Sequence, residues 1–132
     1  MTEPEFLELE QVTPCAVIRV REAVTSLADS RVLAEMEAIL SQVREARSAG
    51  VIIDLEQAAY FGSSLLEALR LLWKDLRARG ENLVLCNVSA VGREILEVAK
   101  FDRIWPLTGN RSDAMAQLDR MGHSSGEPPI LA

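Results

Sequence analysis

Hydrophobic and polar residues alternate near the start of the chain. Residues 5–11 alternate leucine with glutamate, which is the two-residue period of a strand with one solvent-facing side. Thr13 and Pro14 form a turn signal, and residues 15–21 are then rich in valine and isoleucine. This pattern predicts two neighbouring strands that pair in the antiparallel direction.

Longer periods follow, in which apolar residues recur at spacings of three and four, as in amphipathic helices. The first such segment is residues 30–48, with Gly50 expected to end it, and the second is residues 64–79, ended by Gly80. The stripe of the second segment is made by Leu65, Leu69, Leu72 and Leu76. A third helix is expected to begin after Ser89 as its cap. Its apolar side is predicted to carry Val91, Ile95, Val98 and Ala99.

Short, continuous apolar runs separate these helices. Residues 51–55 and 83–88 are typical of strands that are covered on both faces, and residues 104–107 predict a short terminal strand. Asn110 or Ser112 is then expected to start a last helix. The predicted order is β-β-α-β-α-β-α-β-α, an α/β fold with a mainly parallel sheet of about five strands and about four helices.

The length of 132 residues fits one domain, which we assign to residues 1–121, with residues 122–132 as a flexible C-terminal tail. Aromatic residues make up only 5% of the chain, so aliphatic side chains are expected to build the core. The net charge of −6 disfavours a nucleic-acid backbone or an anionic membrane as the partner and favours a protein surface. Two isolated cysteines and an acidic N-terminus indicate a cytoplasmic protein.

Few residues suggest catalysis. The sequence has no Gly-rich phosphate loop, no GxSxG and no HExxH, and its single histidine is His123. Asp54 and Glu56 at a strand end are a possible carboxylate pair, and Cys86 is a weaker candidate nucleophile. They leave open a small hydrolase or nucleotide-binding domain, although solvated carboxylates and a core cysteine explain them more simply. We expect no cofactor, no metal and no enzymatic activity.

The segment that joins the central strand to the second helix is the most informative. Ser64 and Glu67 fit the S-x-x-E capping box, so Ser64 is the expected helix cap. That leaves Ser63 in the adjoining turn, beside Gly62 and close to the free N–H groups and positive dipole end of a helix. A phosphate on Ser63 would meet those donors while adding negative charge to a surface that a partner contacts. The serines also have an ordinary structural interpretation, as cap and turn residues.

The chain from about residue 15 to residue 118 resembles the STAS domain family of bacterial anti-sigma factor antagonists. The resemblance rests on Val51-Ile52-Ile53-Asp54-Leu55, Tyr60-Phe61-Gly62-Ser63-Ser64, Leu83-Val84-Leu85-Cys86-Asn87-Val88-Ser89 and Phe101-Asp102-Arg103-Ile104-Trp105-Pro106-Leu107. It implies a protein that binds an anti-sigma factor, often a serine kinase, and frees a sigma factor for transcription. It also implies that phosphorylation abolishes binding and that a phosphatase restores it.

In the family pattern, Asp-Ser-Ser-Gly or Asp-Thr-Ser-Gly, the first hydroxyl residue accepts the phosphate. That position is Ser63 here, with Ser64 as the alternative acceptor. Gly62 replaces the family's Asp and Leu65 replaces its Gly. A STAS module that binds a partner without a phosphate switch is therefore the alternative function.

The expected partner surface is the turn from Tyr60 to Ser64 together with the loop that carries Leu27 and Asp29. Its members are Tyr60, Phe61, Gly62, Ser63, Ser64, Leu27 and Asp29. Aromatic residues often anchor interfaces, although Phe61 fits a core position equally well. A weak homodimer is a further possibility.

Overall fold

The computed structural model describes residues 6–12, 15–21, 30–46 and 50–122 of the chain. Its elements are β1 (Leu7–Val12), β2 (Cys15–Val20), α1 (Ser30–Ala46), β3 (Gly50–Asp54), α2 (Ser63–Ala78), β4 (Asn82–Cys86), α3 (Ala90–Val98), the 3₁₀ helix η2 (Phe101–Arg103), β5 (Leu107–Thr108) and α4 (Arg111–Gly122). This order of strands and α-helices confirms the predicted one. The predicted tail begins at the last residue of α4, and residues 123–132 lie outside the described part of the chain.

The five strands form one sheet in the order β1-β2-β3-β4-β5. β1 pairs antiparallel with β2, with Leu7 opposite Val20, and every later pair is parallel. Both features confirm the predicted sheet. Because parallel strands end at the same edge, the turns that leave β3 and β4 lie side by side there.

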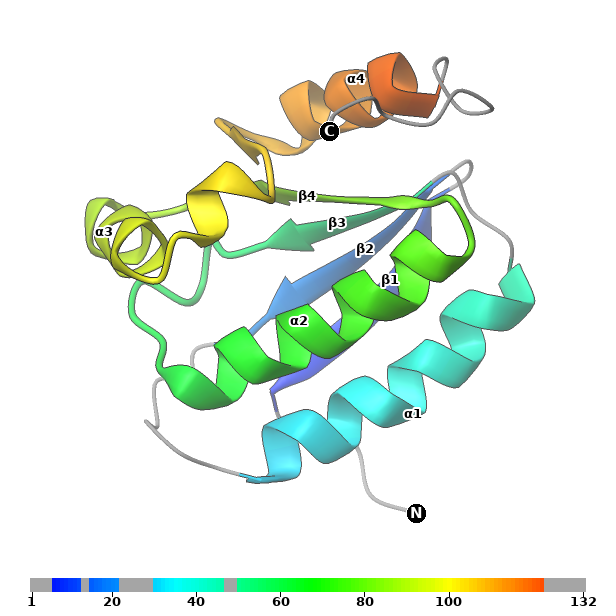
Figure 1. The fold of residues 1–132 in the computed structure, drawn as a ribbon, viewed down its shortest axis with the longest axis horizontal. Helices are drawn as coiled ribbons and strands as arrows, with labels where there is room; N and C mark the ends of the chain where they lie inside the picture. Colours follow the sequence, from blue (N-terminus) through cyan, green and yellow to red (C-terminus); the bar gives the residue numbers. More distant parts are fainter. Residues whose placement is uncertain (1–5, 13–14, 22–29, 47–49, 123–132) are drawn as a thin grey trace.

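Helices cover the two faces of the sheet unequally (Figure 1). α1 and α2 lie across one face, α3 lies at one end, and α4 is on the opposite face. The main core fills the space beneath α1 and α2 and contains the predicted leucine stripe of α2, all of it buried. A smaller group, here called the α4 cluster, lies beneath α4. It consists of Cys15, Val17, Ile52, Val84, Cys86, Ala114 and Leu118.

The predicted inward face of α3 is correct only at Ile95, which packs against the main core. Val91 and Val98 are 49% and 79% exposed, while the buried residues of the helix are Gly92 and Leu96. The reason is a close approach, since a Cβ placed on Gly92 would lie 3.1 Å from Cε2 of Phe61. The absence of a side chain at Gly92 lets this side of α3 pack against the core, which turns the valines outward.

The segment after α3 also differs from its prediction. Residues 101–103 form η2, and only Leu107 and Thr108 pair with β4. The ring of Trp105 stacks on that of Phe101 at 4.6 Å between centroids, so aromatic packing shapes this segment. An expected strand of four residues is therefore a strand of two.

Helix and strand ends follow local chemistry. Gly80 has a φ of 77° just beyond α2, and the Asn110 side chain accepts a hydrogen bond from Asp113 N at 2.8 Å, which makes Asn110 the cap of α4. Gly50, expected to end a helix, is instead the first residue of β3. Among the described residues, the helices lack the length and apolar character needed to span a bilayer.

Candidate functional site

The β3–α2 turn, residues 55–62, leaves the sheet at the shared edge of β3 and β4. Leu55 N donates to the carbonyl of Cys86 at 3.1 Å, and Ala58 N donates to the carbonyl of Leu55 at 3.1 Å. The first bond joins the turn to β4, and the second folds it back on itself. The turn therefore begins as a fixed continuation of the sheet.

Phe61 anchors the other end of the turn. Its side chain is only 1% exposed and belongs to the main core, where it lies against Gly92. Ser89 Oγ donates to the carbonyl of Ala59 at 2.6 Å and accepts from Gly92 N at 2.9 Å. Ser89, the predicted cap of α3, thus also bonds α3 to the turn. Phe61 supports the turn from the core and offers almost no surface to a partner.

The other residues of the predicted partner surface differ in exposure. Tyr60 is 43% exposed, Ser63 is exposed, and Gly62 and Ser64 are half-buried. The expected capping box is wrong, because α2 begins at Ser63 with Gly62 as its N-cap. Ser64 therefore lies inside the first turn of the helix.

Leu27 and Asp29 lie outside the described residues. The described part of the proposed surface is therefore centred on Tyr60 and Ser63. No acidic side chain lies in the first turn of α2, so the N–H groups at this helix start meet no negative charge from that turn.

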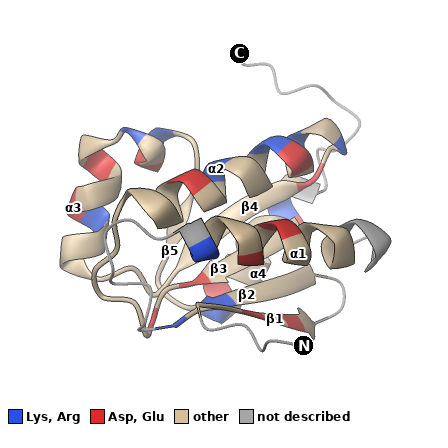
Figure 2. Ribbon diagram, turned by 90° about the horizontal axis from the view of Figure 1, so that it is seen from below, with Lys and Arg blue, Asp and Glu red and all other residues tan. Residues whose placement is uncertain are grey.

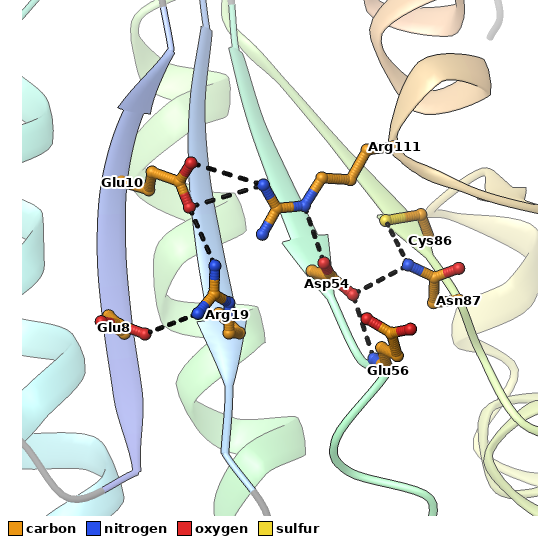
Figure 3. A network of polar contacts seen from close by, with 8 residues as sticks. All are labelled: Glu8, Glu10, Arg19, Asp54, Glu56, Cys86, Asn87 and Arg111. Carbon is orange, nitrogen blue, oxygen red and sulfur yellow. Dashed lines mark hydrogen bonds and ion pairs between the residues drawn. The ribbon is translucent and has the colours of Figure 1, made fainter.

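A second group of functional interest surrounds Asp54, the last residue of β3 (Figure 3). Asp54 Oδ1 accepts from Glu56 N at 3.0 Å and from Asn87 Nδ2 at 3.0 Å, while Oδ2 accepts from Arg111 Nε at 2.8 Å. Glu56 contributes its backbone amide to this group, and its own side chain is exposed. Asp54 is therefore bonded by three donors, and Glu56 takes part through its backbone amide.

Arg111 extends the group across the sheet. Its NH1 lies 3.4 Å from Glu10 Oε1, and Arg19 bridges Glu10 and Glu8 at 3.2 Å and 3.1 Å. The resulting row alternates in charge from β1 to α4, and Figure 2 shows acidic and basic positions mixed over the ribbon. Each arginine in this row therefore lies between two carboxylates.

Electrostatics assign Asp54 a fixed ionised state. Burial on its own raises the pKa of the carboxyl, but the bonds from Asn87, Arg111 and the amide of Glu56 outweigh it and hold the pKa below its ordinary value. The paired charge raises the pKa of Arg111 in turn. Asp54 is a structural anion at neutral pH.

Cys86 is equally unsuited to nucleophilic chemistry. Burial, followed by the negative charge of Asp54, raises the pKa of its thiol to about 12. The thiolate is the reactive form, so Cys86 is inert at neutral pH. The structure places it in the α4 cluster as a core residue. Within the described part of the chain, histidine, cysteine and carboxylate side chains form no group that could hold a metal ion.

Sequence patterns missed Asn87 and Arg111. Asn87 follows β4 with a φ of 57°, a left-handed conformation that asparagine tolerates better than most residues, and a polar residue at the end of an apolar strand was a usable signal. Arg111 is 57 residues from Asp54 along the chain, so local periodicity gave no sign of their contact.

Comparison with known proteins decides the family. A model of the STAS domain matches residues 6–114. The chain belongs to the STAS domain family. Over 82 residues it is 32% identical to BtrV of Bordetella bronchiseptica, whose name is that of an anti-sigma factor antagonist, and the match covers 62% of this chain and 71% of BtrV.

Solved STAS structures share the fold. An anti-sigma factor antagonist domain protein of Planctomyces limnophilus superposes with a TM-score of 0.75 and 26% identity over 87% of this chain and 99% of its own. The antagonist SpoIIAA in its unphosphorylated form gives a TM-score of 0.71 at 18% identity, covering 86% and 96% of the two chains. The phosphorylated form of Bacillus SpoIIAA gives 0.64 at 19%, covering 85% and 98%.

Proposed function

We propose that this STAS protein antagonises an anti-sigma factor in the cytoplasm by binding it, without catalysing a reaction itself. The observation that carries the proposal is the exposed Ser63 at the start of α2, directly after a turn that the buried Phe61 anchors in the core. A preformed surface of this kind suits partner binding because little ordering entropy opposes association. The antagonist name of BtrV gives independent support.

We further propose that a serine kinase regulates this binding through Ser63. The kinase would transfer the γ-phosphoryl group of ATP to Ser63 Oγ, with ADP leaving and the hydroxyl proton passing to the kinase. The phosphate would lie beside the N–H groups of the helix start, which favour an anion. Ser64 is the alternative acceptor, but it is half-buried. A phosphatase would reverse the modification. SpoIIAA is known in an unphosphorylated and a phosphorylated form.

The partner surface in this proposal is Tyr60, Gly62, Ser63 and Ser64, together with Leu27 and Asp29. Tyr60 provides the described aromatic anchor, since Phe61 is buried. An added phosphate would place nearly two negative charges on this surface and would oppose an interface formed with the neutral serine.

The first test is the intact mass of the purified protein after incubation with ATP and lysate of its native host. We expect a gain of one phosphate in the wild type and in Ser64→Ala, and no gain in Ser63→Ala. Ser112→Ala is the matched control, because Ser112 is also exposed in the first turn of a helix. Loss of labelling in Ser112→Ala alone would contradict the assignment of Ser63.

The second test measures partner binding directly. Each anti-sigma factor encoded by the host is purified and titrated with the wild type, Ser63→Ala and Ser63→Glu, and binding is followed by calorimetry. The proposal predicts one binder that tolerates Ser63→Ala and is weakened by Ser63→Glu. Failure of every anti-sigma factor to bind the wild type would overturn the antagonist function.

The alternative is a STAS module that binds its partner without a phosphate switch. Gly62 and Leu65 favour it, since they replace the Asp and Gly of the family pattern on both sides of the acceptor. Leu65 is 1% exposed and belongs to the core, so its side chain leaves the surface of the turn free. Binding of an anti-sigma factor combined with no mass gain on Ser63 would establish this alternative, provided that a known kinase substrate is labelled in the same lysate.

A further inference from the structure

Asp54 is the one polar or charged residue that is buried among the residues the structure describes, at 3% exposure. It lies at the last position of β3, directly before the β3–α2 turn. A buried carboxylate is costly unless donors replace its lost water. The arrangement of those donors shows what this charge does.

The three donors come from three different segments (Figure 3). Glu56 N belongs to the β3–α2 turn, Asn87 follows β4 at the start of the turn to α3, and Arg111 is the first residue of α4. α4 lies on the face of the sheet opposite α2. One carboxylate therefore connects both turns at this edge to a helix on the far side of the sheet.

A contribution to global stability alone does not explain why a buried carboxylate with three donors is present at Asp54. A buried ion pair often contributes no more than apolar residues of similar volume would, because desolvation offsets the attraction. A fully bonded network does, however, fix the relative positions of its members. The donors of Asp54 thus favour a role in positioning.

We propose that Asp54 is a positioning residue that couples the docking of α4 to the conformation of the β3–α2 turn, and thereby to the presentation of Ser63. Arg111 holds Oδ2, which fixes Oδ1 toward Glu56 N and Asn87. When α4 leaves the sheet, the carboxylate loses its charged partner and the turn loses a fixed anchor. Only the last link, to Ser63, rests on the proposed function.

Residue-resolved amide hydrogen exchange in the whole, isotope-labelled protein tests the coupling. The variants are Asp54→Asn, Arg111→Gln and the double variant. Exchange is read at two amides of the turn. Leu55 N donates to the carbonyl of Cys86 and Ala58 N to that of Leu55, so neither amide is bonded to a substituted side chain. Asp75→Asn is the matched control, because Asp75 pairs with Arg79 at 3.0 Å near the other end of α2.

Arg111→Gln is expected to speed exchange at Leu55 and Ala58 by about threefold or more, relative to amides in the middle of α2. In the double variant, Arg111→Gln should add little to the effect of Asp54→Asn. Equal acceleration at all amides would show only a loss of global stability and would overturn the proposal. Independent, additive effects of the two substitutions would overturn it as well. If Asp54→Asn does not fold, the local effect of Arg111→Gln alone still decides.

The link to Ser63 has its own readout. In the ATP and lysate assay, Arg111→Gln should change the rate at which Ser63 gains phosphate, and Asp75→Asn should leave that rate unchanged. If Arg111→Gln alters amide exchange but leaves the rate of Ser63 phosphorylation unchanged, the coupling reaches the turn and the link to Ser63 is overturned. Absence of phosphate in the wild type would count against the proposed switch and leave the exchange result standing.

Discussion

At the scale of single residues, Gly50 shows how closely α4 packs against its face of the sheet. A Cβ at this position would lie 2.6 Å from the carbonyl oxygen of Asn82 and 2.7 Å from Cδ2 of Leu118. One of these contacts is to backbone, which cannot move without disturbing β4. The lack of a side chain here is thus a packing requirement between two strands and α4.

Gly50→Ala should therefore lower the free energy of unfolding by about 1–3 kcal/mol, the usual range for an overpacked core. Urea denaturation followed by circular dichroism measures the change. Gly109→Ala is the control, because the nearest atom to its added Cβ would be Asp113 Oδ2 at 3.5 Å, an ordinary contact. Equal stability of Gly50→Ala and the wild type would contradict the packing seen here.

Individual residues were also where sequence analysis was least accurate. Ser64 matched a capping box but lies inside α2, because the chain turns into the helix one residue earlier than the motif implies. Phe61 had two plausible roles from composition alone, and the close approach of Gly92 settled it as a core residue. Both outcomes depend on contacts with neighbouring segments, which a local pattern does not contain.

At the scale of elements, α3 depends on Ser89 more than a surface helix usually depends on its cap. Ser89→Ala removes the bond from Gly92 N and the bond to the carbonyl of Ala59. We expect a loss of about 1 kcal/mol for the cap, measured by urea denaturation. Ser112→Ala removes an exposed hydroxyl and should stay within about 0.5 kcal/mol of the wild type. Equal losses in both variants would argue against the cap.

α4 should open more readily than the rest of the fold. It covers the sheet through two buried apolar residues, Ala114 and Leu118, two partly buried methionines, Met115 and Met121, and the Arg111 ion pairs. Both free cysteines, Cys15 and Cys86, lie in the cluster beneath it. They therefore report on its opening.

Thiol labelling at neutral pH should be slow in the native protein, because burial raises the pKa of both thiols, that of Cys86 to about 12. Arg111→Gln should speed labelling of Cys86 by about threefold or more if the ion pair contributes to holding α4. Mass spectrometry of the alkylated protein measures both rates. Labelling that tracks global unfolding in every variant would mean that α4 does not open separately.

The elements themselves were largely predictable from sequence. The leucine stripe of α2 and the continuous apolar runs of β3 and β4 are strong periodic signals, and each appears in the structure at nearly the predicted residues. The helix α3 was also predicted, but its core-facing side was not. Val91, Ile95 and Val98 form a stripe next to that of Gly92 and Leu96, and the second stripe is the buried one. A glycine carries no hydrophobic signal, although here it decides which side of the helix faces the core.

At the scale of the whole molecule, Asp54 makes stability depend on pH. Its pKa in the folded protein is lowered, so it contributes stability above the unfolded pKa of about 3.9, and this contribution is lost as pH falls through the folded pKa. Asp54→Asn should be less stable than the wild type at pH 7, and its stability should fall less steeply below about pH 4. Urea denaturation across this pH range measures the slopes, and parallel curves would contradict the assignment.

The candidate site was predictable only in part. The β3–α2 turn stood out because serines, glycine and aromatic residues meet between two strong periodic segments. The row of charges that ends at Asp54 did not, since Glu10 and Arg111 are 101 residues apart in the chain. Long-range polar contacts follow from the assembled sheet, whereas turns follow from local composition.

The two tryptophans of the chain give this fold an optical property of its own. Trp73 of α2 and Trp105 after η2 meet edge to face, with centroids 6.4 Å apart and planes at 74°. Indole transitions at this separation and angle couple, so the pair should produce an exciton signal in ultraviolet circular dichroism that neither ring gives alone. Trp73 lies on the same helix as Ser63. A change in that signal after modification of Ser63 would therefore show, without any label, that the modification shifts Trp73 relative to Trp105.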